Sequence, residues 1–358
     1  EHVVFRGIGF SHAEWFFPKG YTTDSRNPDV GGFNQAATGV PAAVACTGMR
    51  HVTFEECAIT HTGTYGISLG AACQDNLIQR SEIADLGAGG VFLGLKTLEN
   101  DRALLTQRNR LLDNHIHSGG KIFHSAIGVW IGQSPFNRLI HNHIHDFEYT
   151  GISIGWTWGY GPALAYGNIV ELNHVHHIGV LSNGEGPMLS DLGGIYTLGY
   201  QRGTEIRRNV FHDIAGRVYG GWGIYFDEGT TNIRAEENLV YRTKHGGFHQ
   251  HYGKENIFRN NILAFGAEYQ VARTRFEPHM SFAFERNIIL WSGGPVLFGS
   301  MRDSNLIMDR NLYWPVQGSF RYDSLDFSGW QRTGRDVHSL VADPGFADAA
   351  GGDFRLKE

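Results

Sequence analysis

Two aspartates in the middle of the chain have the surroundings that carboxylate chemistry needs. Asp191 lies in the segment SDLGGIYTLG and Asp227 in GGWGIYFDEG, each among apolar residues and close to an Ile-Tyr pair. Glycoside hydrolysis uses two such acids, because one protonates the leaving oxygen while the other activates water or attacks the anomeric carbon. The competing interpretation is that both acids satisfy the amides of turns. We interpret Asp191 and Asp227 as a catalytic pair.

Three copies of one short pattern surround these aspartates. Each copy has glycines, then an apolar residue, then a Tyr or His: Ile195-Tyr196, Ile224-Tyr225 and Phe248-His249. When the copies are aligned, Tyr196, Tyr225 and His249 fall in one column. Leu198, Asp227 and His251, two positions further along the chain, fall in a second column. Because side chains alternate along a strand, the first members face the opposite side, which would be the core. The pattern predicts one patch of carboxylate, imidazole and aromatic groups.

We expect further side chains of this region to bind a sugar substrate. The expected set is Tyr196, Trp222, Tyr225, Glu228, His249, His251, Arg273, Arg275, Trp156 and Trp158. The two arginines would hold sugar hydroxyls or a uronate carboxylate, or else pair with Glu268 or Glu277 as surface structure. The two tryptophans would stack on sugar rings or cover the flank of the fold.

Other chemistries receive less support from the sequence. The pairs His115/His117, His143/His145 and His174/His176 each put two imidazoles on one strand face. Their neighbours offer no obvious third ligand for zinc, so a stacked histidine ladder is favoured over a metal site. The chain has no G-x-S-x-G nucleophile elbow and no phosphate loop. We predict no metal and no cofactor.

The elements that position these residues are turns of a repeat. An Asn followed at the second position by an apolar residue recurs 23 to 36 residues apart, at Asn114, Asn142, Asn173, Asn209, Asn238, Asn261, Asn287 and Asn311. Ser81 and Cys57 take the same place in earlier turns. Asn suits a bend, because it tolerates left-handed backbone and its amide can bond the Asn of the next turn.

Short alternating strands separated by Gly, Asn, Asp and Ser predict an all-β fold, a right-handed parallel β-helix of about eleven turns. One strand cannot bury its inner face alone, so stacked turns share a core of Ile, Val, Leu and Phe. We expect one domain over residues 1–358, with an insertion loop at about 11–50 and a C-terminal cap at about 315–358. Residues 94–107 and 155–167 form two further excursions.

The overall composition narrows the range of partners. The net charge is −6, and no run of like charges marks a nucleic-acid or anionic membrane surface. The longest apolar runs are far shorter than the roughly 20 residues that span a bilayer. No signal sequence opens the chain, which begins in mid-pattern. We therefore expect a carbohydrate substrate, no nucleic acid and no membrane, and the oligomeric state stays open.

The central motifs, together with RNNILAFG, FERNI, DRNLYW and VADPGF, resemble the bacterial right-handed β-helix proteins of glycoside hydrolase family 141. The resemblance covers nearly the whole chain. It implies α-L-fucosidase or xylanase activity on plant cell-wall polysaccharide, a secreted or periplasmic protein, and a catalytic pair at Asp191 and Asp227. Members of that family carry more chain before the first turn, often with a β-sandwich insertion.

These observations predict a glycoside hydrolase, with two alternatives. A polysaccharide lyase on this fold would recruit Ca²⁺ through an acidic cluster and use a basic residue to abstract a proton. A carbohydrate-binding or adhesion β-helix would need only aromatic side chains and asparagine ladders. The sugar, its linkage and the stereochemical outcome are left open by the sequence.

Overall fold

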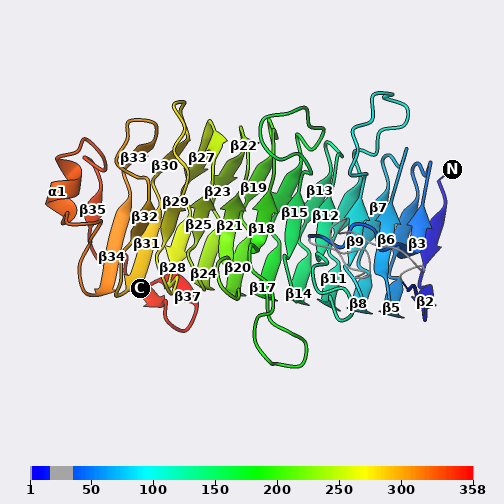
Figure 1. The fold of residues 1–358 in the computed structure, drawn as a ribbon. Coiled ribbons are helices and arrows are strands. Elements are labelled where there is room, and N and C mark those ends of the chain that lie inside the picture. The colour runs from blue at the N-terminus through cyan, green and yellow to red at the C-terminus, as the bar shows by residue number, and fades with distance from the viewer. Residues whose placement is uncertain (1, 17–34, 358) are drawn as a thin grey trace, which may run out of the picture.

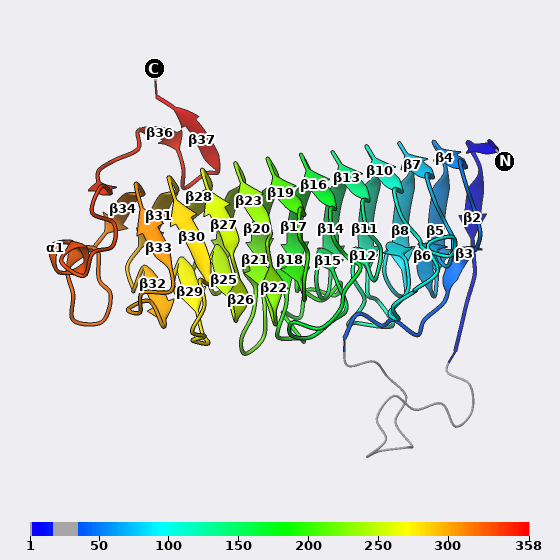
Figure 2. The same ribbon diagram turned by 90° about the horizontal axis from the view of Figure 1, so that it is seen from above.

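The computed structural model describes residues 2–16 and 35–357. In this part of the chain, three long parallel sheets run side by side along one axis (Figure 1). Each turn of the coil adds one strand to each sheet, and the turns stack from the N-terminal to the C-terminal end (Figure 2). The predicted parallel β-helix is confirmed. Most of the predicted insertion loop at 11–50, residues 17–34, lies outside the described residues.

The first sheet has 11 strands in the described chain, each of three or four residues. They are β1 (Val4–Arg6), β4 (Thr53–Glu55), β7 (Leu77–Gln79), β10 (Arg110–Leu112), β13 (Arg138–Ile140), β16 (Ile169–Glu171), β19 (Glu205–Arg207), β23 (Arg234–Glu236), β27 (Asn256–Arg259), β30 (Phe282–Glu285) and β33 (Ile307–Asp309).

The second sheet has 12 described strands and follows the first within every turn. They are β2 (Gly9–Ser11), β5 (Ala58–Thr62), β8 (Glu82–Leu86), β11 (His115–Gly119), β14 (His143–Phe147), β17 (His174–Ile178), β20 (Val210–Ile214), β24 (Leu239–Thr243), β28 (Ile262–Ala264), β31 (Ile288–Ser292), β34 (Leu312–Gln317) and β35 (Leu340–Val341).

The third sheet has 10 described strands, and it carries the region around the two aspartates. They are β3 (Ala42–Cys46), β6 (Tyr65–Leu69), β9 (Val91–Leu93), β12 (Val129–Ile131), β15 (Ile152–Ile154), β18 (Gly193–Thr197), β21 (Trp222–Phe226), β25 (Phe248–Gln250), β29 (Val271–Arg273) and β32 (Leu297–Gly299). Two small sheets pair β22 (Thr230–Thr231) with β26 (Gly253–Lys254), and β36 (Phe346–Asp348) with β37 (Asp353–Leu356).

The core is built from columns of apolar side chains in exact register. In the second sheet, Ile116 pairs with Ile144, and Ile144 with Val175 in the next turn. All three are fully buried. Because strand side chains alternate, every second residue joins such a column and its neighbours face outward. One continuous core therefore fixes the register of every outward-facing residue as well.

An asparagine ladder joins the turns at the bend between the first and second sheets, as predicted. Asn173 Oδ1 accepts from the backbone N–H and from the side-chain amide of Asn142, both at 2.9 Å. Asn173 Nδ2 donates in turn to the backbone oxygen of Leu139 at 2.9 Å and to Asn209 Oδ1. Ser81 and Cys57 continue the ladder toward the N-terminus. A second ladder that the sequence analysis missed runs through Asn76, Asn109, Asn137 and Asn168.

One detail of the ladder differs from the prediction. The left-handed residue at the bend is the one before each Asn, for example Leu172 with φ +59° before Asn173 and Arg208 with φ +56° before Asn209. The buried Asn173 side chain instead reaches the backbone of the preceding turn, where Oδ1 accepts from Asn142 N–H and Nδ2 donates to Leu139 O. The residue before each Asn therefore provides the left-handed conformation of the bend, and the Asn provides its hydrogen bonds.

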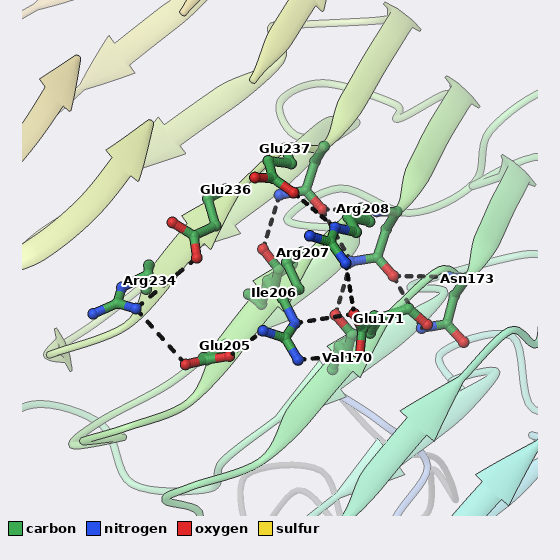
Figure 3. A network of polar contacts seen from close by, with 12 residues as sticks. Val170, Glu171, Asn173, Glu205, Ile206, Arg207, Arg208, Arg234, Glu236 and Glu237 are labelled. Atoms are coloured by element: carbon green, nitrogen blue, oxygen red, sulfur yellow. Dashed lines mark hydrogen bonds and ion pairs between the residues drawn. The ribbon is translucent and has the colours of Figure 1, made fainter. Parts of the chain in front are cut away.

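The outer face of the first sheet carries an ion-pair network (Figure 3). Glu205 lies between Arg207 at 3.1 Å and Arg234 at 3.8 Å, and Arg207 also reaches Glu171 at 3.2 Å. The side chains of Arg207 and Glu171 are partly buried, and surface pairs of this kind stabilise by about 0.2 to 1 kcal/mol each. We therefore regard this face as a solvated surface of the coil.

The chain after β34 closes the C-terminal end. Helix α1 (Phe327–Gln331) begins after Asp326, whose carboxylate accepts from the Gly329 amide at 2.7 Å. Its Trp330 is fully buried and donates to Asp336 Oδ2 at 2.7 Å. The hairpin of β36 and β37 then folds back beside the coil (Figure 2), where Phe354 contacts Tyr241 of the second sheet. These elements lie within the segment predicted to be the cap.

Candidate active site

The three copies of the central pattern form adjacent strands in the third sheet. Tyr196 of β18 pairs with Tyr225 of β21, which pairs with His249 of β25. The rings of Tyr225 and His249 stack at 4.9 Å with an angle of 8°. The apolar partners Ile195, Ile224 and Phe248 are fully buried in the core. The predicted columns are confirmed.

A cavity of about 670 Å³ opens over this part of the third sheet. Its lining residues are Asp191, Tyr219, Trp222, Tyr225, Asp227, Glu228, His245, His249, His251, Glu268, Tyr269, Thr274, Pro295 and Phe298. Both candidate catalytic acids therefore face one space. A cavity of this size accommodates a small sugar unit, since ligand pockets commonly measure about 300 to 1,000 Å³.

Asp227 comes directly after β21 and is 5% exposed. Its backbone N–H donates to Thr197 O at 3.0 Å, and its Oδ2 accepts a short hydrogen bond from the Tyr196 hydroxyl. Burial raises the pKa of Asp227, while hydrogen bonds from Tyr196 and Tyr225 act in the opposite direction. These two phenols stabilise the charged form of a carboxylate that is otherwise poorly solvated.

Asp191 reaches the cavity from a loop, residues 179–192, between β17 and β18. Its backbone is left-handed, with φ +60°, and its N–H donates to Tyr219 O at 3.0 Å. The Tyr149 hydroxyl donates to the backbone oxygen of Asp191 at 2.7 Å. The two acids occupy different places in the repeat, so the catalytic interpretation required this segment to fold back over the patch. The loop does so.

Tyr225 connects the two acids. Its hydroxyl donates to Asp191 Oδ1 at 3.0 Å, and the same side chain lowers the pKa of Asp227. Burial and, to a smaller extent, the charge of Asp227 raise the pKa of Asp191 to about 6, and the Tyr225 hydrogen bond offsets part of the effect. Near neutral pH the pair therefore has one carboxyl that holds its proton more tightly than an ordinary aspartate.

An aromatic wall stands beside the acids, and a glycine makes room for it. Trp222 Nε1 donates to the Tyr269 hydroxyl at 3.0 Å across two turns of the coil. Gly246 lies in the turn between them, and a Cβ there would be 2.8 Å from the Tyr269 ring. Phe298 extends the wall, with its ring stacked on Tyr269 at 4.9 Å. Flat apolar surface of this kind suits one face of a sugar ring.

Two histidines and a glutamate supply polar groups on the other side. His249 Nε2 and His251 Nδ1 lie 2.9 and 2.7 Å from Thr274 Oγ1. Within the described chain His249 Nδ1 has no hydrogen-bond partner, although its side chain is buried and lines the cavity. Burial holds the pKa of His249 well below its usual range, so the ring is neutral. Glu228 accepts from the Tyr252 hydroxyl at 2.8 Å.

The family described as "Right handed beta helix region" matches residues 42–263 of the sequence. The chain belongs to this right-handed β-helix family. The fold class predicted from the repeat is therefore confirmed, including its handedness. No curated protein matches the sequence. No helix in the described part of the chain is long and apolar enough to cross a membrane.

Solved structures share the β-helix fold. A structure titled "Glycoside hydrolase" is 22% identical over 62% of this chain and 38% of that one, with a TM-score of 0.54. The GH136 lacto-N-biosidase from Eubacterium ramulus is 14% identical over 87% of this chain and 56% of its own, with a TM-score of 0.63. The chain thus spans between about one third and three fifths of these proteins. At these identities the likeness is one of fold.

The β-helix places some of the expected substrate-binding residues away from the cavity. Arg273 is fully buried, pairs with Asp303 and donates to Ser300 O at 2.6 Å. It is in register with the buried Gln250 of β25, on the inward side of the strand. The expectation that Arg273 meets the sugar, or pairs with Glu268 or Glu277, is therefore corrected. Arg275 lies over the Tyr252 ring at 4.2 Å and does not line the cavity.

The tryptophans of the earlier turns also lie outside the cavity lining. Trp156 contacts Trp130 edge-on at 5.4 Å and Trp158 at 4.9 Å. Trp158 is 45% exposed. These contacts favour the flank-covering interpretation that the sequence analysis left open. Tyr196 is 2% exposed and reaches the site only through Asp227.

Several residues at the cavity were missed by the sequence analysis. They are Tyr219, His245, Glu268, Tyr269, Thr274, Pro295 and Phe298. Tyr269 had a detectable signal, because it precedes the column residue Ala272 by three positions, as Trp222 precedes Tyr225. Phe298 also had a signal, because it follows Ala272 in the column that contains Tyr225 and His249, whereas Tyr219 had none, since it lies in an irregular turn.

Proposed function

We propose that this chain is a glycoside hydrolase that uses Asp191 as the general acid and Asp227 as the nucleophile or base. The observation that carries the proposal is that the half-buried Asp191 and the buried Asp227 line one cavity, with the Tyr225 hydroxyl donating to Asp191. Such pairs, in which the environment separates two carboxyl pKa values, perform acid and base roles at one site.

The division of roles follows from the surroundings of each acid. Burial and the charge of Asp227 raise the pKa of Asp191 to about 6, so it can deliver a proton to a leaving oxygen in mildly acid solution. Asp227 accepts hydrogen bonds from two phenols, which favour its charged form. A charged Asp227 is then available to attack the anomeric carbon or to activate water.

The lining supports a neutral sugar as substrate. Four carboxylates face the cavity, Asp191, Asp227, Glu228 and Glu268, and no Arg or Lys lines it in the described part of the chain. An anionic uronate would meet negative charge without a cationic partner to bind its carboxylate. The wall of Trp222, Tyr269 and Phe298 would stack on a ring face, while His249 Nδ1 would bond a hydroxyl.

Two further observations agree with the proposal. Structures with this fold include one titled "Glycoside hydrolase" and a lacto-N-biosidase, so the fold is compatible with glycoside chemistry, although a fold alone does not define an activity. The central motifs resemble glycoside hydrolase family 141, which favours fucosidase or xylanase activity on plant cell-wall material. The same resemblance favours a secreted or periplasmic location in a bacterium.

The lyase alternative is less consistent with this cavity. A β-helix lyase acts on uronates and needs a base and a positive group near the substrate carboxylate, whereas this lining is acidic. A purely binding protein would not need Asp191 and Asp227 to be buried together, because unpaired carboxylates are costly to bury. The geometry therefore favours hydrolysis over both alternatives.

The test is an activity screen on aryl glycosides and neutral and uronic cell-wall polysaccharides, read as reducing ends and as absorbance of unsaturated products. We expect reducing ends from neutral substrates, no unsaturated product, and no loss of activity in EDTA. Asp227→Asn should lower turnover by about a hundredfold to ten-thousandfold, the usual contribution of such groups.

The matched control is Asp113→Asn, because Asp113 pairs with His141 on the exposed surface away from the cavity. It should retain parent turnover. Unsaturated products would replace the proposal with a lyase. Saturable binding without product would support the binding protein, and parent activity in Asp227→Asn with normal melting would remove Asp227 from the mechanism.

A further inference from the structure

The outer face of the second sheet carries two columns of histidine rings. In one column His115 stacks on His143 and His143 on His174, both at 5.0 Å. In the other, His117, His145, His176 and His212 stack at 4.8 to 4.9 Å with angles of 4° to 7°. The predicted histidine ladder is confirmed. It lies on strands β11, β14, β17 and β20, on a different sheet from the cavity.

The two columns also interact with each other through their Nε2 atoms. His115 and His145, His143 and His176, and His174 and His212 each approach to 2.7 Å between Nε2 atoms. In such a pair one ring donates its proton and the other accepts with a lone pair. Each diagonal contact therefore places one unprotonated Nε2, the ligand that borderline metal ions prefer, between the columns, and a metal ion that binds there replaces the proton that this nitrogen accepts, which is released to solvent.

Neighbouring carboxylates orient two of these rings. His145 Nδ1 lies 2.7 Å from Asp146 Oδ2, and His212 Nδ1 lies 2.5 Å from Asp213 Oδ2. Histidines that bind metal commonly donate their other ring N–H to a carboxylate, which fixes the tautomer. Of these two, His145 belongs to the middle group defined below and His212 to none of the three. This arrangement was not visible as a ligand pattern in the sequence, because the third ligand of each group comes from an adjacent turn.

Three groups on the ladder bring three ligand atoms within 4.8 Å of one another. They are Glu82 with His115 and His117; His115 with His143 and His145; and His143 with His174 and His176. Ligands around a tetrahedral zinc lie about 3.3 Å apart when the bonds are about 2.0 to 2.1 Å long. Each group includes half-buried histidines, and two include one exposed residue, Glu82 or His174, so we expect side-chain rotation to bring the atoms to that spacing.

We propose that the histidine ladder binds divalent transition metal ions, with zinc, copper or nickel as the class, and holds two ions at once. The number follows from the shared ligands. The middle group uses His115 and His143, which belong to the first and third groups. Ions in the first and third groups share no ligand, so these two sites fill together and the middle one stays open.

The test is isothermal titration of the full chain with Zn²⁺, with stoichiometry as the readout. The parent should bind two ions. His115→Phe keeps a stacking ring but removes a ligand from the first and middle groups, so one ion should remain; His143→Phe should also leave one. The double variant should bind none. Saturation at about 100 times the dissociation constant should raise the melting temperature by about 3 to 4 °C for each bound ion, hence by about 7 °C in the parent.

The matched control is His141→Phe, which removes an exposed histidine of the same turn that pairs with Asp113 and belongs to none of the three groups. It should still bind two ions. Copper bound to the parent should give an electron paramagnetic resonance spectrum with coupling to several nitrogens. This measurement uses the parent protein alone, so it does not depend on whether a variant folds. Parent stoichiometry in the double variant, or a copper spectrum without nitrogen coupling, would overturn the proposal. A parent stoichiometry of one would overturn the two-ion arrangement.

Discussion

The hydroxyl of Tyr225 donates a 3.0 Å hydrogen bond to Asp191 Oδ1, although the two residues are 34 positions apart in the sequence. The same phenol acts on Asp227, two residues further along its own strand. Because Tyr225 stacks on His249 and pairs with Tyr196 in the sheet, its position is set by the register of the coil. The scaffold thus determines where the two acids meet.

Tyr225→Phe should change the pH dependence of hydrolysis. The hydrogen bond from Tyr225 lowers the pKa of Asp191, so its removal should raise that pKa above the present value of about 6. The alkaline limb of the kcat/KM profile, where the acid loses its proton, should move to higher pH, and turnover should fall by roughly tenfold for one lost hydrogen bond. Tyr200→Phe, outside the cavity, should leave the profile unchanged. An unshifted limb in Tyr225→Phe would show that Asp191 is not the acid.

Asp191→Asn should abolish most hydrolysis and yet stabilise the protein at pH 7.5. The folded pKa of about 6 lies above the ordinary value of 3.8, so the native state holds the proton more tightly than the unfolded chain. This contribution to stability is complete below about pH 4 and is lost as the pH rises through 6. Removing the buried charge should add at most about 3 kcal/mol, or about 4 °C in melting temperature.

The pH comparison provides the control for that variant. At pH 4 the folded parent is almost fully protonated at this position and the unfolded chain is about 40% protonated, so the gain should shrink to about 0.5 kcal/mol. Melting by calorimetry at pH 4 and pH 7.5 measures both values. Equal melting of parent and Asp191→Asn at pH 7.5 would contradict the assignment of a buried, charged Asp191.

Asn173→Leu should destabilise the coil without touching the cavity. Leucine cannot accept from the Asn142 amide or donate to Leu139 O, and both groups are buried. The loss should be about 1 to 3 kcal/mol in the free energy of unfolding. Urea denaturation measures it, with the exposed Asn183→Leu as a control that should match the parent. Identical midpoints for Asn173→Leu and the parent would show that the ladder contributes nothing to stability.

The repeat made the columns of the third sheet predictable, because turns that stack in register place their equivalent outward-facing residues one above another. Tyr196, Tyr225 and His249 could therefore be aligned from the sequence alone. Arg273 continues the inward column of Gln250, so counting the alternation through β29 would have excluded it from the site. The error came from reading Arg273 by its charge, whereas strand register places it in the interior.

The position of Asp191 could not be read from the repeat. It depends on a left-handed residue in a loop without periodicity, and on the contact of that loop with Gly220 in the next turn. The ligand groups of the histidine ladder likewise combine residues from two turns, so sequence spacing within one strand does not display them. Sequence reasoning therefore missed contacts between residues that belong to different turns of the coil.

Gly220→Ala should therefore reduce activity while leaving both aspartates in place. A Cβ on Gly220 would lie 2.7 Å from Asp191 N and 2.8 Å from Leu192 N, which forces the loop outward. A displacement of about 1 Å at a catalytic group can cost about a hundredfold in rate. The control is Gly184→Ala, because Gly184 also has a positive φ, of +79°, but no atom lies within 4 Å of its added Cβ. Backbone strain alone should leave turnover intact, so equal losses in both variants would contradict the positioning argument.

The arrangement of the acids also predicts the stereochemical outcome. Asp191 and Asp227 line one cavity together with Tyr225, whose hydroxyl donates to Asp191 Oδ1 at 3.0 Å, so we expect a short separation between the two carboxyls. Retaining enzymes separate their carboxyls by about 5 to 5.5 Å, whereas inverting enzymes need about 6.5 to 9.5 Å to admit a water. We therefore expect Asp227 to act as a nucleophile and the anomeric configuration to be retained.

Proton NMR of the first product formed, recorded before mutarotation, measures the configuration directly. A retaining enzyme should also transfer the sugar to added methanol, because the glycosyl-Asp227 intermediate can be opened by an alcohol in place of water. Asp191→Asn provides an internal check: with an activated aryl leaving group that needs no acid, bond cleavage should recover while turnover of unactivated glycans stays low. An inverted first product would assign Asp227 as a base acting through water and would require the two carboxyls to move apart when substrate binds.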